Sequence, residues 1–294
     1  MRKTLIHSIA VLFAVWFFQS GLRMPEQSGS DFQVNAFAHL PVKYEGRRKP
    51  IDTLARNLLT ILSDKQTVRI DGKRMPASQW FLDNVAGHPD ALDYKVFRIE
   101  NIDLLSSLGL EERRGFRYSY REIMPRLASL DAAARSAFAK DERQRDLYDK
   151  QIIKTANKLY LYQNIMASFE DPSGLPQDQL MATAQRYMQL ENYSIPLVIP
   201  PGSGNPRWRP LMSSLLANHP SMQSMGHVGT VDPLAVQFGT MLAAYRTGNV
   251  QLFNETLNEY GALILAENPD ALSKLSFEIF YNRLGAFMKS AQIY

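Results

Sequence analysis

The chain contains no cysteine among its 294 residues. This absence excludes disulfide bonds, thiolate metal ligands, cysteine nucleophiles and the C-x-x-C-H attachment of c-type haem. An exported protein of this composition must be held together by its apolar core alone.

Short motifs that mark common active sites are also missing. The sequence has no G-x-S-x-G elbow, no S-x-x-K nucleophile pair and no Gly-rich phosphate loop between a strand and a helix. Its adjacent carboxylates, Glu111 with Glu112 and Asp141 with Glu142, lie beside arginines, as is typical of a solvated face. The sequence therefore carries none of these active-site motifs, and we expect no nucleic-acid partner.

Long apolar runs are scarce, and residues 4–18 form the one candidate, preceded by Arg2 and Lys3 in the order that export machinery reads. The run has about 15 residues, short of the roughly 20 that cross a bilayer upright, although residues 19–22 could extend it. No small-residue cleavage pattern follows it. These features favour an uncleaved, single-pass anchor in the inner (plasma) membrane over a cleaved signal peptide. The positive-inside rule places the rest of the chain on the periplasmic, extracytoplasmic side.

We predict a mainly α fold, in which an N-terminal membrane anchor precedes an irregular helical extracytoplasmic body with a small β-hairpin and C-terminal helical hairpins. Composition divides the chain into a signal anchor or transmembrane helix over 1–23, a polar spacer over 24–38, a mixed and helical region over 39–193, a Pro- and Gly-rich linker over 194–231 and a C-terminal helical region over 232–294.

Apolar spacing and capping signals predict the individual elements. Helices are expected over 51–62, 78–85, 101–108, 119–139, 141–169, 177–193, 211–218, 232–246, 249–267 and 269–290. Ser119 and Glu122 form a capping box, and Pro125 should kink the helix that they start. A two-strand hairpin is expected over 67–75, because its Asp71-Gly72 dipeptide suits a type I′ turn.

The formal net charge of +4 is mild, but residues 43–74 hold nine Lys or Arg against four Asp or Glu. Such a basic face could meet anionic lipid headgroups, a propionate-bearing ligand or an acidic partner, or it could be an ordinary solvated surface. The cations that could clamp a carboxylate are Arg47, Arg48, Lys49 and Arg56. Asp52 lies one helical turn before Arg56 and either orients it for a ligand or pairs with it structurally.

The segment over 40–56, L-P-V-K-Y-E-G-R-R-K-P-I-D-T-L-A-R, resembles a known pattern. It is similar to the P-V-x-x-x-G-R-x-K-P-[LI]-D-T segment that follows a transmembrane helix in system II cytochrome c assembly proteins of the CcsA or fused CcsB-CcsA type. Further similar segments are G-K-R (72–74), W-F-L (80–82), V-F-R-I (96–99), R-Y-S-Y (117–120), P-P-G (200–202), A-Y-R-T-G-N (244–249) and E-I-F-Y-N-R (278–283).

The family continues from a segment like 280–294 into a multi-helix membrane domain with a Trp-rich haem-handling loop. Here the three tryptophans, Trp16, Trp80 and Trp208, are scattered, so that motif is missing and no haem ligand is carried over. The resemblance implies a split-off or truncated front half that is not an enzyme in itself. It would support haem delivery to apocytochrome c beside a separate multi-helix haem-handling membrane subunit. The resemblance implies that the four cations contact haem propionates or the partner, and that haem is reached only through the complex.

Two other features lead to different hypotheses. The first is a Met/His loop that suits Cu(I) or an axial position on haem iron, and it holds His219, Met222, Met225 and His227. A solvated loop with methionines on apolar surface is its alternative. The second is an apolar C-terminal face that would serve a non-enzymatic, membrane-anchored scaffold, with core packing as its alternative. This face holds Phe277, Phe280, Tyr281, Leu284, Phe287 and Met288.

Overall fold

The computed structural model describes residues 31–202, 205–221, 231–272 and 275–284. Over these residues the protein is mainly helical with small antiparallel hairpins, which confirms the coarse fold class. The expected anchor over 1–23 lies outside the described residues and stays a prediction. None of the described helices is long and apolar enough to cross a membrane.

The first half of the described chain alternates short strands and helices. Its elements are α2 (Val34–Ala38), β1 (Pro41–Tyr44), β2 (Arg47–Pro50), α3 (Ile51–Ser63), β3 (Thr67–Ile70), β4 (Lys73–Pro76), α4 (Ala77–Val85), η1 (Pro89–Asp93), β5 (Phe97–Arg98), α5 (Ile102–Ser107), β6 (Arg117–Tyr118), α6 (Tyr120–Ile123) and η2 (Met124–Arg126).

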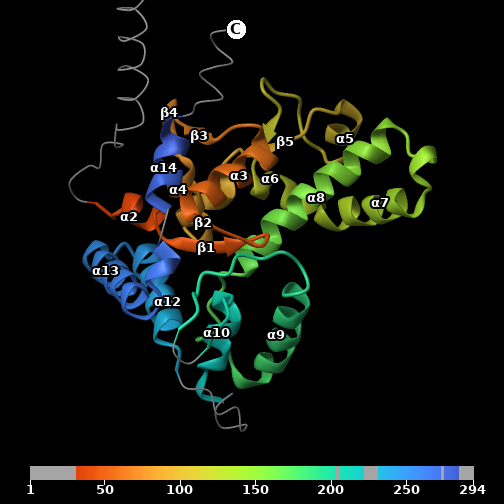
Figure 1. Ribbon diagram of the computed structural model, residues 1–294. Coiled ribbons are helices and arrows are strands. Elements are labelled where there is room, and N and C mark those ends of the chain that lie inside the picture. Colours follow the sequence, from red (N-terminus) through yellow and green to blue (C-terminus); the bar gives the residue numbers. More distant parts are fainter. Residues whose placement is uncertain (1–30, 203–204, 222–230, 273–274, 285–294) are drawn as a thin grey trace, which may run out of the picture.

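The second half is helical. Its elements are α7 (Leu127–Ala139), η3 (Glu142–Gln144), α8 (Leu147–Ala167), α9 (Gln177–Leu190), α10 (Leu211–Ala217), α12 (Pro233–Arg246), α13 (Val250–Glu267), η4 (Pro269–Leu272) and α14 (Leu275–Leu284). Figure 1 shows α3, α4 and the hairpins in the middle, the α7–α8 pair projecting to the right, α12 and α13 at the lower left, and α9 and α10 below.

Three two-stranded antiparallel sheets are present in the described part, where one hairpin was expected. The expected β3–β4 hairpin is confirmed, and its turn residues Asp71 and Gly72 both have positive φ, as a type I′ turn requires. The β1–β2 hairpin was not predicted, because β2 consists of three charged residues and a proline, although Val42 and Tyr44 of β1 favour a strand. It forms around a turn of the same kind at Glu45 and Gly46, and β1 also exchanges backbone hydrogen bonds of 2.9 Å with Leu197.

Local helix signals are largely confirmed. Ser119 caps α6, and its side chain and that of Glu122 form the expected reciprocal capping box. Pro125 interrupts the helix as expected, since the 3-10 turn η2 separates α6 from α7. The long helix expected over 141–169 is wrong at its start: α8 begins at Leu147, because Asp146 forms its own capping box with Asp149. The α7–α8 helical hairpin itself is confirmed.

Two aromatic residues at the end of the expected spacer over 24–38 pack against the helical body. The Phe32 ring lies 4.5 Å from the Tyr245 ring and 5.1 Å from the Phe253 ring, and Phe37 is fully buried. Phe32 and Phe37 therefore hold this segment against α12 and α13, and the division of the chain at 24–38 stays a prediction.

The segment that precedes α10 enters the core. Val198 and Ile199 are fully buried, and the Tyr260 hydroxyl donates a hydrogen bond to the Val198 carbonyl. A small separate apolar cluster joins α9 to α10. These contacts describe local packing, and the division of the chain at 194–231 stays a prediction.

The C-terminal helices follow their predicted boundaries as far as residue 267. Asp232 caps α12 through the amides of Leu234 and Ala235, and Gly248 turns the chain into α13 with a φ of 74°. The single helix expected over 269–290 is wrong at its start, because a 3-10 turn, η4, comes first and α14 begins only at Leu275. Residues 285–290 of that expected helix lie outside the described residues.

Candidate functional site

The basic hairpin, which we define as residues 41–50, carries three of the four candidate cations. In its register Tyr44 faces Arg47, Lys43 faces Arg48, and the turn lies between the strands. Arg47 and Arg48 are exposed beside the turn, whereas Lys49 is 6% exposed. The hairpin therefore separates the three neighbouring cations into two environments.

Arg47 and Arg48 contact the C-terminal part of the described chain without being buried by it. Arg47 Nη2 lies 3.5 Å from Glu278 Oε1, with the two side chains 71% and 25% exposed. A surface ion pair of this kind contributes about 0–1 kcal/mol. Arg48 donates to the backbone carbonyl of Asp270. A guanidinium group has five N–H donors, so both arginines can still donate hydrogen bonds to a carboxylate that approaches from solvent.

Lys49 belongs to the interior of the basic hairpin. Its Nζ lies 5.1 Å from the centre of the Tyr44 ring, a cation–π contact. Burial lowers the pKa of Lys49, and Arg47 adds to that effect while Glu45 and Glu278 oppose it. Burial, helped by the Glu45 charge, raises the pKa of Tyr44 to about 12. Lys49 is thus less available to a ligand than Arg47 or Arg48.

Asp52 and Arg56 form the structural pair that the sequence left open. Arg56 Nε donates to Asp52 Oδ2 at 2.7 Å, and the side chains are 22% and 8% exposed. Asn282 of α14 donates to the same Asp52 oxygen at 3.3 Å and to Thr53 Oγ1 at 2.7 Å. Thr53 in turn donates to Glu278 Oε1 at 2.9 Å.

The first turn of α3 and the helix α14 are therefore joined by side-chain hydrogen bonds across more than two hundred residues of sequence. These two elements belong to the segments over 40–56 and 278–283 that carry the sequence resemblance. Sequence reasoning named both segments but did not place them together. The proposed roles of these residues in binding a ligand or partner stay predictions.

The Met/His loop can be followed only at its first member. His219 is described, and its Nδ1 accepts a hydrogen bond of 3.2 Å from the Ser221 amide. Met222, Met225 and His227 lie outside the described residues. Within the described residues, no group of three or more His, Asp or Glu side chains is placed to hold a metal ion.

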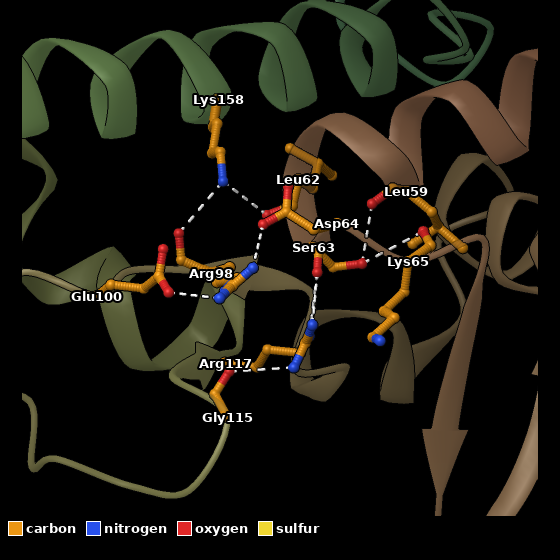
Figure 2. Close-up of polar contacts among 10 residues, drawn as sticks. All are labelled: Leu59, Leu62, Ser63, Asp64, Lys65, Arg98, Glu100, Gly115, Arg117 and Lys158. Carbon is orange, nitrogen blue, oxygen red and sulfur yellow. Dashed lines mark hydrogen bonds and ion pairs between the residues drawn. The ribbon is translucent and has the colours of Figure 1, made fainter. Parts of the chain in front are cut away.

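A buried cation that the sequence analysis missed lies at the C-terminal end of α3 (Figure 2). Lys158 of α8 is 6% exposed, and its Nζ donates to the carbonyls of Leu62 at 3.0 Å and Arg98 at 3.2 Å. Arg117 donates to the neighbouring Ser63 carbonyl at 2.7 and 3.2 Å. Lys158 and Arg117 thus donate hydrogen bonds to carbonyls of the last turn of α3, which have no intrahelical partners.

Burial lowers the pKa of Lys158, although the nearby Asp64 carboxylate opposes the shift. Asp64 Oδ2 lies 2.5 Å from Arg98 Nη1. Burial raises the pKa of Asp64, but the hydrogen bond from Arg98 and the charge of Lys158 outweigh it, so the pKa is lowered. The sequence signal for this cluster was the position of Lys158 on the apolar side of α8, between the buried Thr155 and Tyr162.

A second missed cluster surrounds Asp83 of α4, which is 3% exposed. Its carboxylate accepts hydrogen bonds from the hydroxyls of Tyr94 at 2.6 Å and Tyr245 at 2.5 Å, and from the amide of Gln79 at 2.8 Å. Burial and the adjacent Asp83 raise the pKa of both tyrosines. The cluster joins α4 to the residue that follows η1 and to α12, and it stabilises the packing of these elements.

Comparison with known proteins gives no relative. No family model, no curated protein and no solved structure matches the chain.

Proposed function

We propose that this chain is the extracytoplasmic part of a system II cytochrome c assembly complex, where it supports delivery of haem to apocytochrome c. Residues 1–23 anchor it in the inner membrane, and the body faces the periplasmic side. The chain is not itself an enzyme in this proposal. It works beside a separate multi-helix membrane subunit that handles haem.

The observation that carries the proposal is the contact between α3 and α14. The two segments that most closely resemble the family hold each other through Thr53 and Glu278, and through Asn282 with Asp52 and Thr53. A resemblance confined to unrelated surface segments would be weaker support. Here both segments belong to one packed unit, which supports treating them as parts of one functional element.

Within this element the residues divide by role. Arg47 and Arg48 are the exposed cations, and arginine binds carboxylates in a bidentate manner. They are therefore our candidates for contact with haem propionates or with the partner subunit. Lys49, Asp52 and Arg56 hold the hairpin and the first turn of α3 in place.

The test replaces Arg47 and Arg48 together by alanine in the full chain, expressed in its own host. We expect less cytochrome c with covalently attached haem, measured by haem staining of membrane proteins, at normal levels of the variant protein. A matched control replaces Arg114 and Arg143, two exposed arginines outside the hairpin, by alanine. Unchanged cytochrome maturation in the first variant, with normal protein levels, would contradict the proposal.

A second candidate function, a membrane-anchored scaffold, is favoured by the outer face of α14. Phe277 is 72% exposed and Tyr281 is 42% exposed, whereas Leu275 and Ile279 on the inner face are 5% and 2% exposed. Exposed aromatic residues one helical turn apart are typical anchors for a partner protein. The remaining residues of the expected apolar face are either half-buried, as Phe280 is, or without a described side chain.

The scaffold hypothesis has its own test. Replacing Phe277 and Tyr281 by serine should reduce the size of the detergent-solubilised complex on a native gel, because the apolar anchors are lost. Leu265→Ser is the control, since Leu265 is 57% exposed on α13. Complexes of equal size in all three proteins would exclude this face as the contact.

A further inference from the structure

The β3–β4 hairpin places two arginines directly opposite each other. Arg69 of β3 is the register partner of Arg74 of β4, and the turn between the strands has two residues. In such a hairpin the residues that flank the turn exchange the hydrogen bonds, so the next pair outward is the non-hydrogen-bonded kind. Opposing side chains stand closest in that kind of pair. Two guanidinium groups therefore leave the same face of the hairpin at short spacing.

Like charges directly opposite each other in a sheet are destabilising unless something neutralises them. Arg74 Nε donates to Thr67 Oγ1 at 3.1 Å, which is a neutral acceptor. In the described part of the chain, neither Arg69 nor Arg74 forms an ion pair, and Arg69 has no hydrogen-bond acceptor. The fold therefore keeps two opposed arginines that no ion pair within the described residues neutralises.

The other two strand pairs also place two cations opposite each other, and among the described residues carboxylates neutralise the pair formed by Arg98 and Arg117. Lys43 faces Arg48, and Arg98 faces Arg117. Arg48 donates to a backbone carbonyl in η4, Arg98 forms ion pairs with two carboxylates, and Arg117 donates to two backbone carbonyls. The β3–β4 pair differs from the β5–β6 pair, because no carboxylate in the described part of the chain forms an ion pair with Arg69 or Arg74.

A cleft of about 830 Å³ lies against this hairpin and η1. Lys73 and Lys95 line it together with Arg69 and Arg74, and neither lysine has an ion-pair partner among the described residues. The aspartates that line it are Asp71, Asp90 and Asp93. Arg121 Nε already neutralises Asp93 at 2.7 Å, so the cleft keeps an excess of positive charge.

We propose that this cleft binds a phosphate-bearing anion, which Arg69 and Arg74 clamp while Lys73 and Lys95 add positive charge. The planar guanidinium fork matches phosphate oxygens in a bidentate manner, and two opposing forks can grip one phosphate group from both sides. The cleft is larger than a single phosphate, so a diphosphate or a lipid headgroup fits its dimensions. This site does not depend on the proposed function, because it uses a different hairpin and different residues.

The test measures binding by titration calorimetry to the full-length chain in a non-ionic detergent. The probes are inorganic pyrophosphate, dihexanoyl phosphatidylglycerol and dihexanoyl phosphatidylcholine. An ionic strength of about 0.01 M keeps screening weak, with a Debye length of roughly 30 Å. We expect pyrophosphate or the anionic lipid to bind, and the zwitterionic lipid not to bind. Binding of the anionic lipid without pyrophosphate identifies a headgroup, and the reverse identifies a soluble phosphate compound.

The variants separate a built site from general surface charge. Arg69→Gln with Arg74→Gln should weaken binding by roughly tenfold or more, because two charge-assisted contacts are lost. Arg114→Gln with Arg143→Gln changes the net charge equally away from the cleft and should leave affinity within about twofold. Arg69→Lys with Arg74→Lys keeps the charge but removes the forks, so it should also weaken binding.

Three outcomes would overturn the proposal. They are no binding of either anionic probe, equal loss in the cleft and control glutamine variants, or full retention of affinity in the cleft glutamine variant. Circular dichroism of each variant checks that the fold is kept. Since both arginines are exposed and repel each other, their replacement should not destabilise the ligand-free protein.

Discussion

Replacing Lys158 by methionine tests how the C-terminal end of α3 is held. Methionine keeps an unbranched apolar stem of similar length, so packing changes little, but the ammonium donor is lost. The carbonyls of Leu62 and Arg98, which accept from Nζ at 3.0 and 3.2 Å, then lose a buried partner (Figure 2). The change removes one charged donor and leaves two acceptors to find another.

The magnitude follows from opposing contributions. Hydrogen bonds to charged groups contribute about 1.5–3 kcal/mol each, so two lost bonds cost roughly 3–6 kcal/mol. Removing an ammonium from a buried position returns several kcal/mol of desolvation, and the lowered pKa of Lys158 shows that burial acts against its charge. We therefore expect the free energy of unfolding to fall by about 2 kcal/mol.

The assay is urea unfolding of the full chain in detergent, followed by circular dichroism. A lower midpoint at unchanged slope would show a loss of stability alone. Lys154→Met is the matched control, because Lys154 is exposed on the same helix, and it should change stability by less than about 0.5 kcal/mol. Equal midpoints for the Lys158 and Lys154 variants would refute the reasoning.

The pH dependence of the same variant gives a sign that can be checked. Because the pKa of Lys158 is lowered in the folded protein, the unfolded chain binds more protons between that lowered pKa and the ordinary value of about 10.4. The contribution of Lys158 to stability therefore rises with pH across this window. The stability difference between the natural protein and Lys158→Met should widen there, and a constant difference would contradict the assignment.

Three further predictions concern buried polar groups and one turn. Asp83→Ala leaves the hydroxyls of Tyr94 and Tyr245 without their acceptor, so urea unfolding should show a loss of about 3 kcal/mol. Burial raises the pKa of Tyr94, Tyr245 and Tyr260, whereas an unfolded tyrosine titrates near 10. Above pH 10 the unfolded chain therefore releases these protons first, and each tyrosine should lower the free energy of unfolding by about 1.4 kcal/mol per pH unit, measured as alkaline unfolding. Gly72→Ala should cost about 1 kcal/mol in thermal unfolding, because φ is 79° there although no neighbour crowds the position.

Local signals in the sequence predicted local structure. The Asp71-Gly72 turn, the capping box at Ser119 and the ion pair of Asp52 with Arg56 each depend on residues within four positions of one another. Their geometry follows from backbone preferences and helical spacing, which any chain with these residues shares. The same reasoning placed most helix boundaries within a few residues.

The candidate site was only half predictable. The exposed cations Arg47 and Arg48 stand out in the sequence by charge alone. The contact of Thr53 with α14 does not, because it depends on a partner 225 residues away. Lys49 shows the limit most clearly, since nothing in its neighbourhood distinguishes it from Arg48, yet the hairpin buries one and exposes the other.

The sequence by itself determined the turns, the helix caps, the amphipathic helices and the uneven distribution of charge. The tertiary structure alone decided which charged side chains are buried or paired within the fold and which stay exposed to a ligand. Lys158 acts on a carbonyl 96 residues away, and Asp83 accepts from a tyrosine 162 residues away. Desolvation and hydrogen bonding depend on all the atoms packed around a group, and only the complete fold brings those atoms together.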